Sequence, residues 1–248
     1  MRKIAIIVGL AVTSAAFAQT SGKELLDEFA KNLNSAKSLS ATYTLQPIGG
    51  VPATYNMQLS KPNLARFETP RLIVVADGKN ITTYTKADKT YSKEPQTNEN
   101  LQGLFADDDA SLWLAFFNGD ALSGARMVKN LGPKTRQGVD YTKIQATMDP
   151  GGHKTAVFYI DKDKIARQAE ITQTDDKGTY TLLISASAVN LGAEPIEAEK
   201  LAFVAPAGSH ELTAEELNSN KWFEDIEEAK KMAARTHRLV MVDFYAVW

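Results

Sequence analysis

The side chains that most often carry out catalysis are scarce in this chain of 248 residues. It has no cysteine and three histidines, His153, His210 and His237. None of them forms a His-x-x-x-His pair, and no Gly-x-Ser-x-Gly sequence occurs, so neither zinc hydrolysis nor a serine triad is supported. Without a thiolate the chain also lacks a nucleophile for disulfide exchange. We therefore expect binding rather than catalysis, and no cofactor.

Three consecutive aspartates, 107–109, are the best candidate for a metal site. They directly precede an apolar run, 110–117, which Asn118 and Gly119 follow. Carboxylates at the start of a helix usually interact with its dipole, and no Asp-x-Asp-x-Asp-Gly loop follows. We predict a short helix and no metal. Because this helix is apolar nearly all round, protein or an apolar ligand must surround it.

The elements that surround this helix are predicted to be strands of one large antiparallel sheet. Alternating or continuously apolar runs bounded by turn residues indicate strands at 40–46, 55–59, 65–68, 72–76, 81–85, from Thr90 onward, 141–148, 156–160, 166–172, 180–189 and 201–204. The polar stretch 92–102 is expected to be a loop, and 72–76 to be buried on both faces. About ten strands exceed what a flat open sheet tolerates. We therefore expect a curled sheet, an incomplete barrel.

A helix over 23–37 is predicted to cover this sheet. Ser21 and Glu24 have the spacing of a capping box. Leu25, Leu26, Phe29, Leu33 and Ala36 then recur at helical spacing. Packing into the core is favoured over a mobile lid. The predicted fold class is α+β, a curled antiparallel sheet covered by helices.

Residues 1–18 have the order of a secretory signal. Arg2 and Lys3 precede an apolar run, and Ala16-Phe17-Ala18 precede Gln19, where the mature chain is expected to begin. The apolar run is too short to span a bilayer. No cysteine follows it that could be lipidated. We expect an exported, periplasmic and soluble protein without a membrane span after cleavage. Of the 28 basic side chains two lie in this segment, which leaves 26 against 30 acidic ones, a net charge of −4. This balance argues against nucleic acid and anionic membranes as partners.

Several short sequences within residues 23–209 carry a resemblance to a known family. They are 61–64 (Lys-Pro-Asn-Leu), 75–79 (Val-Ala-Asp-Gly-Lys), Tyr84, and 201–208 (Leu-Ala-Phe-Val-Ala-Pro-Ala-Gly). The chain resembles the periplasmic lipoprotein carriers of the LolA and LolB type and their superfamily, which includes lipid-binding sensors of envelope stress. This resemblance implies a half-barrel with a helical lid around an apolar cavity for acyl chains, and a strand arginine that locks the lid. The matching position is Lys61, with Arg66 as a second candidate, although lysine lacks the planar fork of arginine.

The apolar ligand is expected to lie between the curled sheet and the 110–117 helix. The side chains expected to line this cavity are Phe67, Leu72, Val74, Leu112, Trp113 and Phe116. An apolar small molecule or the acyl chains of a lipoprotein would be the partner. A structural scaffold without a cavity is the alternative for this domain.

The pattern changes after Pro206. We expect a linker at 210–220, although Thr213 and Glu216 have the spacing of a second capping box. Trp222, Phe223, Ile226, Ala229 and Ala233 then recur at helical spacing, and an apolar strand is expected at 239–245.

The end of the chain resembles the strand that leads to the Cys-x-x-Cys pair of thioredoxins. Asp243, Phe244 and Trp248 carry this resemblance, with Asp243 matching the buried acid of that family. We expect 221–248 to be the beginning of a thioredoxin-like domain that continues past Trp248. The alternative function is then part of an exported thiol-disulfide oxidoreductase that recognises a protein client. A terminal strand that joins the edge of the barrel is the other interpretation.

Overall fold

The computed structural model describes residues 20–106, 110–218, 222–236 and 239–242. The helices in these residues are α1 (Gly22–Ser35), α2 (Asn98–Gly103), the 3₁₀ helix η1 (Ser111–Phe116), α3 (Ala198–Leu201), α4 (Ala214–Asn218) and α5 (Ile226–Thr236). The strands are β1 (Ser38–Pro47), β2 (Ala53–Ser60), β3 (Leu64–Glu68), β4 (Leu72–Ala76), β5 (Asn80–Thr85), β6 (Thr90–Pro95), β7 (Arg126–Arg136), β8 (Val139–Thr147), β9 (Lys154–Ile160), β10 (Ala166–Asp175), β11 (Gly178–Gly192) and β12 (His210–Glu211).

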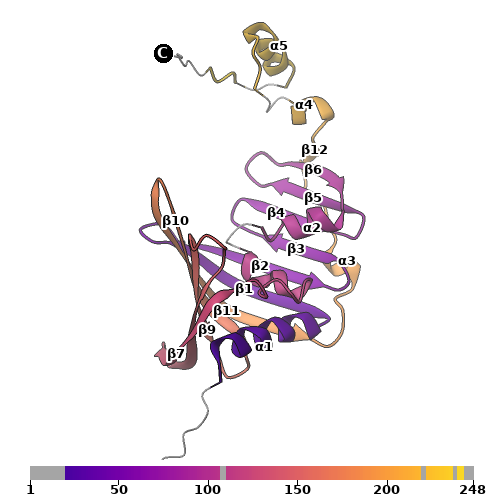
Figure 1. Cartoon of the computed structure of the whole chain (residues 1–248). Helices are drawn as coiled ribbons and strands as arrows, with labels where there is room; N and C mark the ends of the chain where they lie inside the picture. The colour runs from indigo at the N-terminus through magenta and orange to yellow at the C-terminus, as the bar shows by residue number, and fades with distance from the viewer. Residues whose placement is uncertain (1–19, 107–109, 219–221, 237–238, 243–248) are drawn as a thin grey trace, which may run out of the picture.

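All the strands of the described residues belong to one curled sheet that does not close. Its order is β12-β6-β5-β4-β3-β2-β1-β11-β10-β9-β8-β7. Every neighbouring pair is antiparallel except β12 and β6. The two halves of the sheet bend toward one side, where α1, α2 and η1 lie (Figure 1). The predicted curled antiparallel sheet covered by helices is therefore confirmed.

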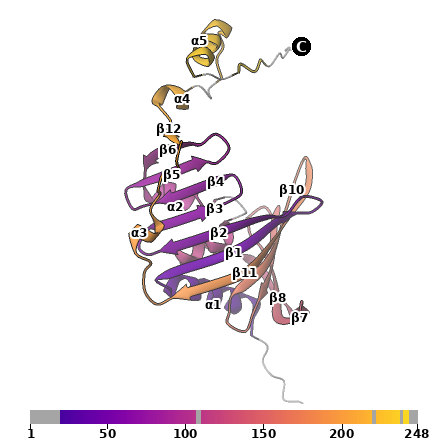
Figure 2. The same ribbon diagram turned by 180° about the vertical axis from the view of Figure 1, so that it is seen from behind.

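The two faces of the sheet differ in chemistry because strand side chains alternate. On β1, Leu39, Ala41 and Tyr43 are buried beneath the helices, and we call their side of the sheet the inner face. Ser40 and Thr42 point to the opposite side, the outer face. Residues 193–209, which we call the strap, connect β11 to β12 across the outer face (Figure 2).

Helix α1 confirms the predicted amphipathic helix within one or two residues at its ends. The hydroxyl of Ser21 accepts a hydrogen bond from the N–H of Glu24, 3.1 Å away, as the capping box requires. Leu26, Phe29 and Leu33 are fully buried and belong to the core. The apolar stripe thus packs on the inner face.

Three sequence-based expectations about the sheet and its connections are wrong, and one strand was not predicted. Residues 92–102 are not a loop, because β6 extends to Pro95 and α2 begins at Asn98. Residues 201–204 do not form a strand: α3 ends at Leu201, and the strap continues without pairing. Strand β7 was not predicted. In β4 only Val75 and Ala76 are buried, whereas Leu72, Ile73 and Val74 are half-buried.

Candidate functional site

Aromatic side chains fill the space between the inner face and the segment that covers it. This covering segment comprises the described residues 98–106 and 110–125, which connect β6 to β7. The ring of Trp113 lies 5.9 Å from that of Tyr43 on β1, which stacks on Tyr55 of β2 at 5.5 Å. Phe67 on β3 meets Phe105 edge-on at 5.4 Å. The covering segment is therefore attached to the sheet through rings.

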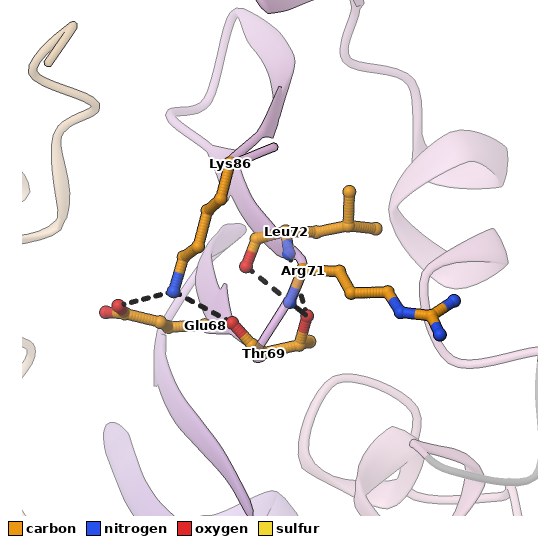
Figure 3. A network of polar contacts seen from close by, with 5 residues as sticks. All are labelled: Glu68, Thr69, Arg71, Leu72 and Lys86. Carbon is orange, nitrogen blue, oxygen red and sulfur yellow. Dashed lines mark hydrogen bonds and ion pairs between the residues drawn. The ribbon is translucent and has the colours of Figure 1, made fainter. Parts of the chain in front are cut away.

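The structure brings most of the side chains that were expected to line a cavity into this one cluster. Phe67, Leu112, Trp113 and Phe116 are buried members of the core. Val74 is half-buried and packs against the core. Leu72 is half-buried just after the turn at Thr69 (Figure 3) and is not among the residues that form this core or pack against it. In this cluster an apolar ligand would have to displace side chains of the chain itself.

Trp113 carries a buried polar group that lacks a hydrogen-bond partner within the described residues. Its side chain is fully buried, and its Nε1–H has no hydrogen-bond partner within the described residues. A buried donor without a partner costs about 1–3 kcal/mol, since it has lost its water. The closed arrangement therefore includes a polar group that opening, or a ligand oxygen, would satisfy.

Lys61 connects three parts of the structure beside the ring cluster. It lies in the turn between β2 and β3, and its Nζ donates to the main-chain oxygen of Asn34 at the end of α1. The same Nζ lies 5.5 Å from the centre of the Phe116 ring in η1, a cation–π distance. The Nδ2 of Asn34 donates to the main-chain oxygen of Phe116 at 3.2 Å. We call Asn34, Lys61 and Phe116 the clamp.

The folded chain makes the charged form of Lys61 less favourable than it is in water. Burial, and then the neighbouring positive charge of Lys37, lower the pKa of Lys61 below its ordinary value of 10.5. The folded chain therefore disfavours the ammonium form relative to water. Of the two candidates for locking the covering elements, Lys61 is the one that contacts them.

Arg66 lies on the other face of the sheet. Its Nη1 donates to the main-chain oxygen of Ala202 in the strap, 3.2 Å away. Position explains the difference: Arg66 alternates with Ala65 and Phe67, which face inward.

A cavity of about 310 Å³ opens on the outer face and was not expected from the sequence. Ten residues of β11, β1, β2 and β3 line it: Ser40, Ala41, Thr42, Asn56, Met57, Gln58, Arg66, Glu68, Ala188 and Asn190. Its polar lining residues alternate with apolar ones along each strand, and this pattern is also typical of a strand face that is simply exposed to solvent. The sequence therefore did not reveal the cavity. We call this cavity the outer groove.

Neither a metal centre nor a membrane-spanning helix is found in the part of the chain that the structure describes. The aspartates 107–109 and His237 lie outside it. His153 belongs to an exposed turn in which the carboxylate of Asp149 accepts its main-chain N–H at 3.1 Å. His210 approaches Glu216 at 3.3 Å, also at an exposed position.

The C-terminal region gives the thioredoxin resemblance no structural support. The second capping box is confirmed, because the main-chain N–H of Thr213 donates to Glu216 at 2.8 Å and the Thr213 hydroxyl accepts from the Glu216 N–H at 3.2 Å. Helix α5 is present and an ion pair joins its Arg235 to Glu215. The expected strand, however, is not formed over 239–242, where Leu239 is 99% exposed. Asp243, Phe244 and Trp248 lie outside the described residues.

No family model and no curated protein matches the chain. Among solved structures it is similar to an uncharacterized conserved protein from Thermus thermophilus, with a TM-score of 0.48 and 14% identity over 77% of this chain and 97% of the other. MucB gives a TM-score of 0.45 and 16% identity over 74% of this chain, which spans only 63% of MucB. A LolA superfamily protein from Nitrosomonas europaea gives a TM-score of 0.36 and 6% identity over 75% and 99%.

Proposed function

We propose that the chain is an exported, non-catalytic binding module that admits an apolar or acyl chain between the inner face and the covering segment. Acyl chains of a lipoprotein and apolar small molecules share the required chemistry. The observation that carries this proposal is the covering segment itself, which closes the inner face with rings and leaves the indole N–H of Trp113 buried without a partner within the described residues.

The covering segment is suited to local opening. Its two helices, α2 and η1, have six residues each, and helices this short are not stable without tertiary contacts. Our proposal requires that this segment open at a lower free energy than the strands beneath it, despite its buried side chains. An acyl chain that takes the place of the rings on Tyr43 and Phe67 would bury comparable apolar surface.

Trp113 also indicates what part of the ligand would be polar. An ester, amide or carboxyl oxygen placed beside Nε1 would accept the hydrogen bond that Trp113 lacks within the described residues. Such an oxygen adjoins the hydrocarbon of every acyl chain. The clamp would then act as the closing contact, because Lys61 holds both α1 and Phe116.

Binding of dansyl-undecanoic acid, a fluorescent fatty acid, tests this proposal. We expect saturable binding that unlabelled hexadecanoate displaces, and about two- to tenfold weaker binding by Trp113→Phe, the range of one hydrogen bond. Trp222→Phe is the matched control, since Trp222 is 72% exposed. An absence of saturable binding, or displacement equal to that of an unrelated detergent, would overturn the proposal.

Export is proposed from residues 1–18, which lie outside the described structure. Mass spectrometry of the protein expressed with these residues should find a mature chain that begins near Gln19. A chain that retains Met1 in the cell extract would contradict export by this signal.

The alternative function is part of a thiol-disulfide oxidoreductase. It depends on the resemblance of residues 242–248 and of the helix that precedes them. The chain itself has no cysteine, so it supplies no thiolate for exchange. The codon sequence after Trp248 decides this alternative: anything other than Cys-x-x-Cys directly downstream removes it.

A further inference from the structure

The strap shows that side chains of the outer face can bind main-chain groups of a segment that crosses it, here one that includes helix α3. Ser38 on β1 donates to the main-chain oxygen of Glu194 at 2.7 Å. Ser60 on β2 bonds both the N–H (2.9 Å) and the oxygen (3.1 Å) of Ile196. Arg66 on β3 donates to the oxygen of Ala202. Outer-face side chains of three adjacent strands thus bind main-chain groups of a segment that crosses them.

The next two rows of the same strands repeat this chemistry. Ser38 pairs with Ser60 across β1 and β2, beneath the strap. One step further along the strands, the row is Asn190, Ser40, Gln58 and Arg66, and the following row is Ala188, Thr42, Asn56 and Glu68. Both rows line the outer groove. The groove is therefore a second track beside the strap.

The dimensions of this track suit a short extended peptide. Four strands about 4.8 Å apart give a length of about 14 Å, the reach of about four extended residues. The two rows are about 6.7 Å apart along the strands, so side chains flank a peptide on both sides. The cavity of about 310 Å³ is at the lower end of the range for ligand sites.

The side chains of the groove retain hydrogen-bonding capacity. Ser40, Gln58 and Asn190 form no side-chain hydrogen bond within the described residues. Thr42 donates to Asn56 Oδ1 at 2.8 Å, which leaves the amide nitrogen of Asn56 as a donor. Amides and hydroxyls that donate and accept match the main-chain groups of a peptide, as Ser60 already shows in the strap.

The charges of the groove favour an acidic group at its β3 end. Glu68 is neutralised by Lys86, whose Nζ lies 3.0 Å from its carboxylate and also donates to the Thr69 oxygen at 2.8 Å (Figure 3). Arg66, in contrast, contacts only the neutral oxygen of Ala202 within the described residues. Its remaining guanidinium donors suit a carboxylate, which an arginine binds through two parallel bonds.

We propose that the outer groove binds an extended peptide segment of a partner protein, across β11, β1, β2 and β3, with a carboxylate of that segment at Arg66. A peptide is favoured over a glycan because no aromatic side chain among the described residues lines the groove to stack on a sugar ring. The site lies on the face opposite the covering segment, so it does not depend on the proposed ligand of the inner face.

Selection of phage-displayed random nonapeptides against the full chain tests this inference, followed by fluorescence anisotropy with the enriched peptides. We expect these peptides to share an acidic residue or to need their terminal carboxylate. Arg66→Gln should weaken binding about tenfold, as expected for loss of one charge-assisted pair. Gln58→Ala should weaken it about threefold.

Gln168→Ala is the matched control, because Gln168 is a half-buried glutamine on the outer face of β10 and lies outside the groove. Its affinity should equal that of the wild type. Should Arg66→Gln unfold through loss of the strap contact, Gln58→Ala decides, since Gln58 makes no internal hydrogen bond through its side chain within the described residues.

Three outcomes would overturn the inference. The first is a selection without binders. The second is a set of binders that Gln58→Ala and Gln168→Ala affect equally. The third is displacement of the peptides by N-acetylglucosamine oligomers that bind more tightly, which would assign the groove to a glycan. Saturating hexadecanoate should leave peptide binding unchanged, so the failure of either proposal is visible without the other.

Discussion

The substitution Phe105→Ala distinguishes between two hypotheses: that the covering segment opens locally, and that it unfolds only together with the core. Phe105 is 1% exposed, and its ring meets Phe67 of the sheet at 5.4 Å and Phe117 at 5.7 Å. Phe158 on β9 is 2% exposed and belongs to the same core, but it lies in a strand that is paired on both sides. The two residues are therefore matched in size and burial and differ in the element that carries them.

Their expected effects differ for the same reason. A buried Phe→Ala substitution costs about 3–5 kcal/mol. For Phe158→Ala this loss applies to the whole fold and lowers the melting temperature by about 6–20 °C, at about 2–4 °C per kcal/mol for a domain of this size. For Phe105→Ala the loss applies first to the covering segment, whose contribution to global stability is only its own free energy of opening.

Hydrogen exchange and thermal unfolding together measure this difference. Phe105→Ala should accelerate exchange of the amides in 98–106 and 110–125 by about 10²–10³-fold, the equivalent of about 3–4 kcal/mol. It should lower the melting temperature by less than Phe158→Ala does. Equal losses of melting temperature, with exchange in the segment occurring only through global unfolding, would refute a segment that opens locally and with it the proposed route for an apolar ligand.

Two further predictions concern charged side chains. The buried carboxylate of Asp161 accepts hydrogen bonds from the N–H groups of Asp163 and Ile165, both at 2.9 Å, and from Arg167 Nε at 2.6 Å. Asp161→Asn should lower the free energy of urea unfolding by about 1–3 kcal/mol, because an amide nitrogen cannot accept from Arg167. Asp163→Asn, at an exposed position of the same turn, should lower it by almost nothing, and equal urea midpoints for the two variants would contradict this. The pKa of Lys61 is lowered in the folded chain, so the unfolded chain binds more protons between the folded pKa and 10.5, and Lys61 adds stability as the pH rises through this interval. Over this interval the urea midpoint of the wild type should increase relative to that of Lys61→Met. A difference that shrinks instead would show that the fold prefers the ammonium form.

Turn chemistry and helix caps made most of the sheet predictable. Strand β4 has the predicted bounds of 72–76, and β2, β3 and β5 differ from prediction by one or two residues at their ends. Asp77 explains why the β4–β5 turn is so well marked: its carboxylate accepts from the N–H groups of Lys79 and Asn80, at 2.8 and 2.7 Å. Such contacts are local in sequence, so spacing alone reveals them.

Strand β7 could not be predicted because its sequence contains residues that are tolerated only in a strand at the edge of a sheet. It contains Gly132, with φ at +88°, and Pro133, and its pairing with β8 is interrupted by two bulges. Proline and bulges are tolerated where one side of a strand has no partner. Only the position of β7 at the end of the sheet, a property of the whole fold, makes this sequence a strand.

Residues 201–204 of the strap were predicted to be a strand because they form a short apolar run, Leu-Ala-Phe-Val. Leu201 is buried and Val204 is 79% exposed. Phe203 lies against Tyr84 and Tyr91 on the outer face, with ring centres at 5.9 and 5.2 Å. A short apolar run therefore indicates contact with a surface, and the hydrogen bonds that distinguish a strand from an unpaired segment come from residues far away in the sequence.

The sequence predicted which residues belong to the candidate site, but not how these residues are arranged in space. The apolar run at 110–117 had to be surrounded, and η1 is indeed buried. Which cation contacts it depended on the register of β3, since a shift of one residue exchanges the faces of Ala65 and Arg66. The outer groove depends on register across four strands, which no local pattern reveals.

One alternation along β1, β2 and β3 therefore creates two surfaces with different chemistry. The inward residues form a ring cluster whose cover is attached by packing and by the clamp, and the proposed ligand would replace apolar groups with apolar groups there. The outward residues form rows of amides and hydroxyls, of which the first row is already occupied by the strap. Because the backbone of the sheet separates the two surfaces, an occupant of one need not compete with an occupant of the other. If both proposals hold, a single sheet would carry an acyl chain on one side and a polypeptide on the other, the arrangement required of a module that presents an apolar cargo to a protein partner.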